Sequence, residues 1–227
     1  MLILAGLLLS LHYHIILRAR ASSKPCIKGN NEEVTVLEMS TAKVVNGIST
    51  EQIQGMIAAV KKQPQMAQAK IYAKNKWISG FNNKALIKDF EMGGALNTTS
   101  RKTPFVIAGD HPPELLGTNK APASVEVLLA ALGHCISNGF AMYGAAMGIP
   151  VESLTIDVEG DIDLQGLLML PEPGKVRAGF QEIRVTYYVK SKATKDQLEK
   201  LAKMSEDFSP VRDSIRAVKF SSKLVIQ

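Results

Sequence analysis

The sequence predicts an α+β protein in which an antiparallel sheet wraps around one long buried helix. The stretch from Val127 to Ile149 contains no formally charged residue and carries apolar or small side chains on every helical face. A helix that is hydrophobic all round belongs in an interior. The expected strands come in runs rather than alternating with helices, which argues against a doubly wound sheet. Because a one-sided sheet covers only part of such a helix, we expect a second copy of the chain to cover the rest in a homodimer.

The composition is that of a folded globular protein with a hydrophobic core. Hydrophobic residues make up 46% of the 227 residues and charged residues 21%, which excludes a disordered chain. The formal net charge is +6, but the lysines and arginines are scattered, with no dense run and little aromatic interleaving. A solvated surface explains this distribution better than a phosphate-binding stripe. We therefore expect no nucleic-acid partner.

Residues 1–38 form an unusual leader. Residues 2–11 read LILAGLLLSL, and the positive charges Arg18 and Arg20 follow this run, whereas a secretory signal carries them before it. The apolar run is about half as long as the roughly 20 residues that a membrane span needs. We favour the interpretation that residues 1–38 are a mis-assigned extension and that translation begins at Met39. A weak membrane anchor or an export signal in residues 1–20 is the alternative, and we expect a cytoplasmic protein without a membrane partner.

Residues 39–227 are expected to form a single domain that opens with a capped helix. Ser49 and Gln52 read as a capping box, and apolar residues follow at helical spacing up to Pro64, which predicts a helix at about 49–63. Three strands are then predicted: one that comprises residues 70–73 and 76–78, one at 85–92 and one at 103–108.

Alternating strands and a second capped helix are predicted after the long helix. Residues 154–158 and 183–189 alternate between apolar and polar side chains, as half-buried antiparallel strands do. Gly160 suggests a bulge or kink at the end of the first of these strands. Thr194 and Gln197 read as the cap of the helix. Its inner face is expected to comprise Leu198, Leu201, Ala202 and Phe208, and a last strand is predicted at 218–226.

Cys135, in the middle of the long helix, is the strongest candidate for chemistry. The cysteines Cys26 and Cys135 and the four histidines show no metal-ligand spacing, so we expect no metal and no cofactor. A lone cysteine in an apolar helix is usually an inert hydrophobe. Cys135 also lies too far from the helix start for the helix dipole to activate it. The adjacent His134 points about 100° away around the helix, so any activation must come from elsewhere in the fold or from a partner subunit.

The run from His111 to Cys135, HPPELLGTNKAPASVEVLLAALGHC, resembles the signature of the OsmC/Ohr family. That signature is a Pro-Glu-Leu-Gly turn, a loop and Pro-x-Glu-Leu-Leu-x-Ala-Ala-x-x-x-Cys, and the order of elements agrees from about Lys70 to Gln227. The resemblance implies an intertwined α+β homodimer with active sites at the subunit interface. It also implies that a helix cysteine attacks organic hydroperoxides, that a second cysteine resolves the sulfenic acid and that external thiols reduce the disulfide. Carried over, the attacking cysteine is Cys135.

Three positions depart from the family pattern. The family's resolving cysteine stands before Pro-Val in the last helical region, where this chain has Ser209, which cannot form a disulfide but is an ordinary helix cap. The activating glutamate of the hydroperoxide-resistance branch corresponds to Val125. Glu126, the next residue, is kept as a candidate for this catalytic role, although it faces away from Cys135 on a continuous helix and is better explained as a favourable first-turn anion. Arg101 is the nearest candidate for the activating arginine of that branch, and its spacing fits poorly.

Two hypotheses of function follow. In the first, the protein is a thiol-dependent reductase of organic hydroperoxides in oxidative-stress defence, with Cys135 as its only catalytic cysteine and an external thiol as reductant. In the second, the fold has no catalytic activity, and an apolar cleft between subunits binds a small hydrophobic ligand. A third interpretation, a membrane span at 127–149, has the required length, but polar residues interrupt the stretch and amphipathic strands surround it.

Overall fold

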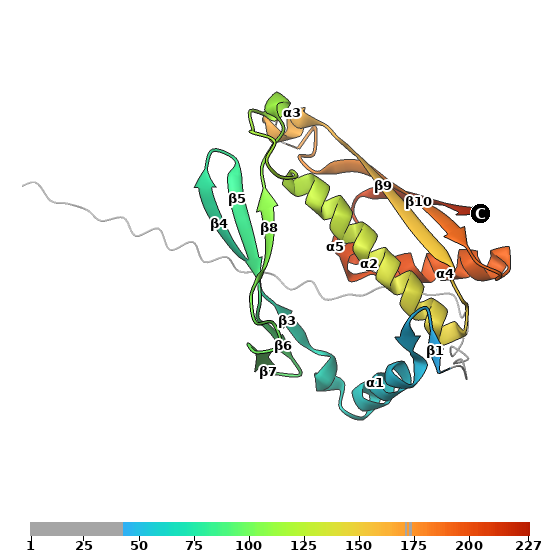
Figure 1. The fold of residues 1–227 in the computed structure, drawn as a ribbon. Helices are drawn as coiled ribbons and strands as arrows, with labels where there is room; N and C mark the ends of the chain where they lie inside the picture. The colour runs from blue at the N-terminus through green and yellow to red at the C-terminus, as the bar shows by residue number, and fades with distance from the viewer. Residues whose placement is uncertain (1–42, 171, 173) are drawn as a thin grey trace, which may run out of the picture. The chain divides into compact units, whose positions relative to one another are not determined.

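The computed structural model describes residues 43–170, 172 and 174–227, so the predictions for residues 1–38 and for a start at Met39 lie outside the described residues. The helices are α1 (Thr50–Lys62), α2 (Ser124–Met147), α3 (Leu164–Leu167), α4 (Lys195–Asp207) and α5 (Pro210–Ser214), with 3₁₀ turns η1 (Pro64–Ala67) and η2 (Pro113–Leu115) (Figure 1). The strands are β1 (Val44–Val45), β2 (Ile48–Ser49), β3 (Ala69–Ile71), β4 (Lys74–Ser79), β5 (Asn82–Ile87), β6 (Phe90–Met92), β7 (Ala95–Asn97), β8 (Phe105–Gly109), β9 (Ser153–Ile162), β10 (Phe180–Lys190) and β11 (Lys219–Ile226).

The long helix α2 supplies one wall of the hydrophobic core. Leu132, Ile136 and Phe140 are fully buried and pack with inward side chains of β10 and α4. The helix ends at Gly148, which adopts the left-handed conformation (φ 71°) that glycine tolerates best. By length and composition alone, α2 is long and apolar enough to cross a membrane, and it is the one such helix among the described residues.

The chain on its own covers α2 on part of its circumference. Ala130, His134 and Asn138 follow one another at intervals of about one turn and are all exposed. The predicted buried helix is therefore present, but its charge-free surface is not fully enclosed by the described residues of one chain.

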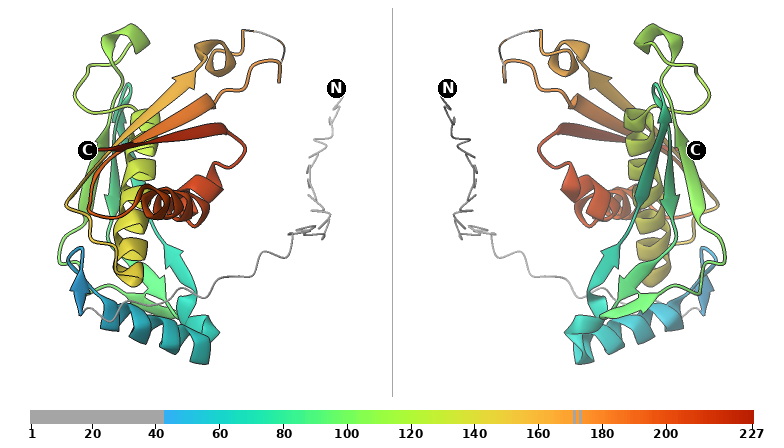
Figure 2. Two further views of the ribbon diagram at one scale, coloured as in Figure 1. Left: turned by 90° about the vertical axis from the view of Figure 1, so that its right-hand side faces the viewer. Right: turned by 90° about the vertical axis from the view of Figure 1, so that its left-hand side faces the viewer.

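The C-terminal sheet has the strand order β11-β10-β9 and carries the other wall of the core. In β10, Ile183, Val185, Tyr187 and Val189 are buried and alternate with less buried residues, which confirms the predicted half-buried strand. Strands β9 and β10 are antiparallel, whereas β10 and β11 are parallel. This one parallel pair departs from the antiparallel sheet that the sequence predicts, because α4 and α5 form a crossover between the two strands. Helix α4 packs against α2 (Figures 1 and 2).

Two details of this half of the molecule differ from the prediction. Strand β9 runs through Gly160 without a bulge, and the irregularity lies on β10, between Phe180 and Glu182. A Cβ atom on Gly160 would lie 2.5 Å from the Phe180 ring, so the glycine makes room for that ring. Phe208 is 65% exposed and follows the end of α4, so its assignment to the inner face of that helix is wrong.

Strands β1 and β2 form a two-stranded sheet, and strands β3 to β8 form two separate three-stranded sheets, β3-β6-β7 and β4-β5-β8. The predicted single strand at 85–92 is wrong, because β5 ends at Ile87 and β6, in the other sheet, begins at Phe90. The predicted cap of α1 is confirmed: the Ser49 hydroxyl accepts a hydrogen bond from the Gln52 N–H at 3.2 Å.

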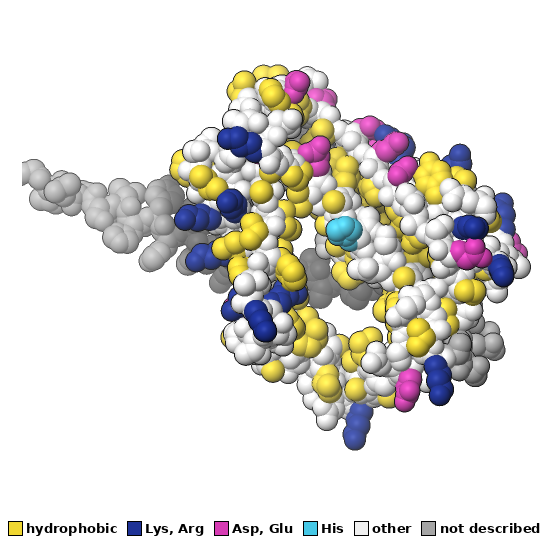
Figure 3. Space-filling model, in the orientation of Figure 1, with side chains coloured by type: hydrophobic (Ala, Val, Ile, Leu, Met, Phe, Trp, Pro, Cys, Tyr) yellow, Lys and Arg dark blue, Asp and Glu magenta, His cyan; other side chains and the backbone are white. Residues whose placement is uncertain are grey.

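One face of the β4-β5-β8 sheet is apolar and exposed. Phe105 and Ile107 lie two residues apart on β8, and Trp77 is aligned with Gly109 through Asn83, so all three apolar side chains share one face. Their exposed fractions are 62%, 38% and 70%, respectively. In the space-filling view, hydrophobic side chains lie over these strands among lysine and arginine side chains (Figure 3). We call Trp77, Phe105 and Ile107 the apolar sheet face.

Asn46 joins the N-terminal hairpin to the end of α2. Asn46 and Gly47 connect β1 to β2 with positive φ angles of 53° and 74°, the combination that a two-residue hairpin turn requires. The Asn46 side chain donates hydrogen bonds to the carbonyls of Ala141 (3.3 Å) and Ile149 (3.1 Å) and accepts one from the Val151 N–H (2.8 Å). These bonds fix the hairpin to the last part of α2 and to the segment that follows the helix.

Candidate functional site

Cys135 lies where α2 meets the segment that joins α4 to α5. Its sulfur accepts a hydrogen bond from the Ser209 hydroxyl, with an Oγ–Sγ distance of 3.0 Å. Ser209 is 3% exposed, and its Oγ also accepts a hydrogen bond from the Arg212 backbone N–H at 3.1 Å. The predicted role of Ser209 as a helix cap is confirmed, because it is the N-cap residue of α5. The residue that the resemblance aligns with the family's resolving cysteine thus contacts the predicted nucleophile.

A close approach of α4 to α2 brings these two residues together. One turn after Cys135, a Cβ atom on Gly139 would lie 3.3 Å from Cα and Cβ of Ser205. The absence of a side chain at Gly139 therefore lets α4 lie tightly against α2 just before the chain turns at Ser209. Pro210 is the first residue of α5, where its missing N–H costs no hydrogen bond.

Tyr143, an aromatic residue that the sequence pattern did not single out, interacts with Cys135 and packs against Phe208. Burial raises the pKa of the Tyr143 hydroxyl, and the electrostatic interaction with Cys135 raises this pKa further. The ring of Phe208 meets the Tyr143 ring edge-on, with 6.1 Å between the ring centroids. The sequence signal for this contact is the spacing of eight residues between Cys135 and Tyr143, which is a little over two helical turns. Because helical side chains lean towards the N-terminus, the long Tyr143 side chain extends back towards Cys135.

Glu126 acts on the start of α2. Its Oε2 accepts a hydrogen bond from the Ala123 backbone N–H at 2.7 Å. A capping box has two hydrogen bonds, and only the one from the Ala123 N–H to the Glu126 carboxylate is present here. The other bond is missing because Ala123 has no side-chain oxygen. The interpretation of Glu126 as a favourable first-turn anion is confirmed, and no hydrogen bond joins it to Cys135 in the described part of the chain.

Arg101 lies between two aromatic rings. Its guanidinium is 5.2 Å from the centre of the Phe90 ring and 5.4 Å from that of Phe105, and its Nη1 donates to the Lys88 carbonyl at 3.2 Å. Within one chain these contacts engage the cation away from Cys135. Its assignment as the activating arginine stays a prediction.

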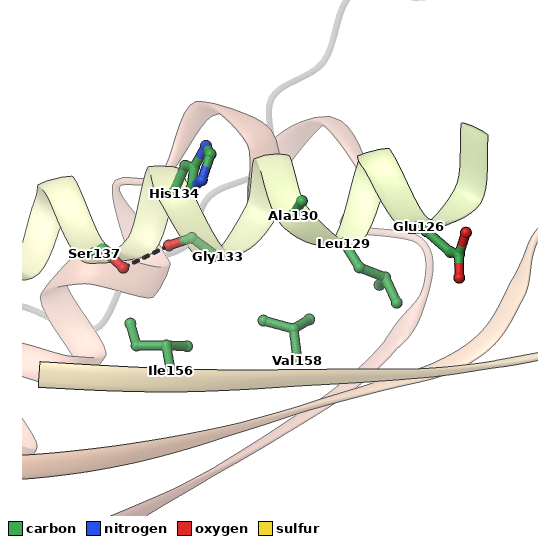
Figure 4. A pocket seen from close by; sticks show the side chains of 8 residues that line it. All are labelled: Glu126, Leu129, Ala130, Gly133, His134, Ser137, Ile156 and Val158. Atoms are coloured by element: carbon green, nitrogen blue, oxygen red, sulfur yellow. Dashed lines mark hydrogen bonds between the residues drawn. The ribbon is translucent and has the colours of Figure 1, made fainter. Parts of the chain in front are cut away.

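His134 and Cys135 belong to different sides of α2. A cavity of about 520 Å³ lies between α2 and β9, and its lining includes His134 but not Cys135. Figure 4 shows Leu129, Ile156 and Val158 facing one another across this cavity, while the His134 ring points away from β9. No three His, Cys, Asp or Glu side chains among the described residues are grouped so that they could hold a metal ion.

The loop that leads into α2 is organised by Asp110, which the sequence analysis also missed. This carboxylate is 1% exposed and accepts hydrogen bonds from the Thr118 hydroxyl (2.5 Å) and from the backbone N–H groups of Thr118 (3.2 Å) and Lys120 (3.0 Å). These bonds, the Thr118 hydroxyl first, hold the pKa of Asp110 well below its usual range. Gly117 allows the tight return of this loop, since a Cβ there would overlap the His111 carbonyl.

Comparison with known proteins identifies the fold. Residues 117–223 match the family model described as OsmC-like protein, and no curated protein sequence matches the chain. The structure of an OsmC-like protein from Mycoplasma pneumoniae superposes with a TM-score of 0.51 at 14% identity, over 70% of this chain and 96% of that one. The structure of an OsmC-like protein of unknown function from Vibrio cholerae superposes with a TM-score of 0.51 at 16% identity, over 69% of this chain and 99% of that one.

An organic hydroperoxide resistance protein OsmC from Legionella pneumophila aligns at 17% identity over 67% of this chain and 96% of that one, with a TM-score of 0.46. The family match and the two closer superpositions agree with the resemblance carried by the run from His111 to Cys135. That resemblance is therefore confirmed: the chain has the fold of the OsmC/Ohr family, and its residues 117–223 form an OsmC-like domain.

Proposed function

We propose that the protein reduces organic hydroperoxides, with Cys135 as the only catalytic cysteine and an external thiol as the reductant. One observation supports the proposal: Cys135, which the resemblance aligns with the family's attacking cysteine, contacts Ser209, which it aligns with the resolving cysteine, at an Sγ–Oγ distance of 3.0 Å. Because a serine cannot form a disulfide, an oxidised Cys135 needs a thiol from outside the described part of the chain.

The proposed reaction has two stages. The Cys135 thiolate attacks the terminal oxygen of the hydroperoxide, so that an S–O bond forms while the O–O bond breaks and the alkoxide leaves as an alcohol after taking a proton from water. The sulfur is oxidised to a sulfenic acid and the peroxide is reduced. One external thiol then displaces water from the sulfenic acid to form a mixed disulfide, and a second thiol releases Cys135 and the external disulfide.

The surroundings of the thiol favour an apolar substrate. Tyr143, which interacts with Cys135, packs edge-on against the ring of Phe208, and Phe208 is 65% exposed. The described contacts of Cys135 include no lysine or arginine that would select an acidic substrate.

We also propose that residues 39–227 act as one domain and that the working form is a cytoplasmic homodimer. Two uncovered surfaces support a second copy: the charge-free stripe of α2 at Ala130 and Asn138, and the apolar sheet face. Burial of both would enclose the central helix, as the resemblance implies.

The test compares the full chain with its Cys135→Ser variant and with Cys26→Ser as the matched control. Consumption of cumene hydroperoxide is measured in the presence of a dithiol, and dimedone labelling of the Cys135 peptide detects the sulfenic acid. We expect wild type and Cys26→Ser to consume the peroxide and Cys135→Ser to lose at least about a hundredfold, since no other thiol stands at this position. Equal consumption by wild type and Cys135→Ser would overturn the proposal and favour the ligand-binding alternative.

A further inference from the structure

The hydroxyl of Ser209 is fixed by two hydrogen bonds of opposite direction. Its oxygen accepts from the Arg212 backbone N–H at 3.1 Å, and its hydrogen is donated to the Cys135 sulfur at 3.0 Å. The side chain is 3% exposed, so water has little access to either bond. Because the accepted bond holds the oxygen in place on the backbone of α5, the donated hydrogen has one described target, the sulfur.

We propose that Ser209 is a positioning residue for the Cys135 thiolate: its hydroxyl stabilises the ionised sulfur and fixes the direction in which the sulfur faces its substrate. The inference rests on the proposed function, because it assigns Ser209 a task at the same sulfur. It also gives the position a role different from the resolving role that the family resemblance implies for a cysteine there.

The other candidates for this task are engaged elsewhere within the described chain. Glu126 bonds to the Ala123 N–H, and the Arg101 guanidinium stacks on aromatic rings. His134 lines the cavity on the other side of α2. Ser209 supplies the one side-chain hydrogen bond to Sγ among the described residues. A hydrogen bond to an ionised acceptor is roughly twice as strong as one between neutral groups, so this donor favours the thiolate over the thiol.

Loss of this donor changes the pH dependence of the reactivity of Cys135 in a way that a purely structural role of Ser209 would not. A stabilised thiolate forms more readily, but it is also a weaker nucleophile, with a Brønsted coefficient of about 0.4–0.5. We take the case in which the bond favours ionisation of the thiol about tenfold. Near pH 6.5, where few thiols are ionised, removal of the bond then slows alkylation about threefold. Near pH 10, where most thiols are ionised, removal speeds alkylation about threefold, because the thiolate that is left is the stronger nucleophile. The pH profiles of the variant and the wild type therefore cross.

The experiment measures the rate of alkylation of the full chain by iodoacetamide from pH 6 to pH 10, read at the Cys135 peptide by mass spectrometry. Ser209→Ala removes the hydroxyl. Ser209→Gly removes it as well but keeps a residue that helix N-caps accept almost as well as serine, so it replaces the alanine variant if that one fails to fold. Pro210→Ala is the matched control, because it alters the start of α5 and keeps the hydroxyl.

We expect the profiles of Ser209→Ala and Ser209→Gly to cross that of the wild type and the profile of Pro210→Ala not to cross it. The proposal would be overturned if the Ser209 variants had the same pH profile of alkylation as the wild type, or if their rates changed in the same direction at both ends of the pH range. A wild-type Cys135 that iodoacetamide does not modify would overturn it as well. The assay contains no peroxide. Crossing profiles in a protein that consumes no hydroperoxide would therefore support the role of Ser209 and contradict the proposed function alone.

Discussion

Asp110 is a buried carboxylate on which the loop before α2 depends. It accepts the Thr118 hydroxyl and two backbone N–H groups, and these bonds favour its charged form and lower its pKa. A carboxyl group with a lowered pKa in the folded state contributes stability that is present above its unfolded pKa of about 3.9. This contribution is lost as the pH falls through the lower, folded-state pKa.

We therefore expect Asp110→Asn to lower the melting temperature at pH 7, because an amide cannot accept all of these bonds and carries no charge for them to stabilise. The difference in melting temperature between the variant and the wild type should narrow as the pH falls below about 4, where the ionised Asp110 begins to lose its contribution to stability. Thermal unfolding followed by circular dichroism between pH 3 and pH 8 measures the gap. Asp157→Asn, at an exposed position, is the control with little change expected. A gap that does not vary with pH would contradict the assignment.

At the scale of elements, the Asn46 side chain is the link between the β1–β2 hairpin and the end of α2. Its three hydrogen bonds reach backbone groups near Ala141, Ile149 and Val151. Asn46→Ala should lower the free energy of unfolding by about 2–3 kcal/mol, at about 1 kcal/mol for each bond. Asn46→Asp keeps the acceptor but turns a carboxylate oxygen towards the carbonyls of Ala141 and Ile149, so a loss at least as large as that of Asn46→Ala is expected. Urea unfolding at one fixed protein concentration measures these changes, and a loss below about 0.5 kcal/mol for Asn46→Ala would show that the link contributes little.

The elements divide into those that local signals predict and those that distant contacts decide. Ser49 and Thr194 cap α1 and α4 as predicted, because a cap involves residues three positions apart. The division of the strand at 85–92 was not predictable, since the turn at Lys88–Asp89 contains no glycine or proline. The site shows the same limit: Cys135 and Ser209 are 74 positions apart, and only the family resemblance suggested that they belong together.

At the scale of the whole molecule, the proposed homodimer would cover two surfaces that the described residues of one chain leave exposed: the stripe of α2 at Ala130 and Asn138, and the apolar sheet face. We expect the wild type to sediment as a dimer in analytical ultracentrifugation. Trp77→Glu, on the apolar sheet face, should raise the dimer dissociation constant at least tenfold, which corresponds to about 1.4 kcal/mol. Lys84→Glu is the matched control, because Lys84 lies on β5 with its side chain on the opposite face of the same sheet. A monomeric wild type, or equal effects of the two substitutions, would contradict the proposed dimer.

The pairing of the strands has a consequence for how such a dimer can form. Among the described strands, those of residues 44–109 pair with one another, those of residues 153–226 pair with one another, and no ladder joins the two groups. The later group includes the core partners of α2 and α4, and its backbone hydrogen bonds do not depend on the earlier strands. The strands of residues 69–109 can therefore be exchanged with a neighbouring copy without breaking a backbone ladder, while Asn46 keeps β1 and β2 joined to α2, which makes domain swapping a low-cost route of assembly.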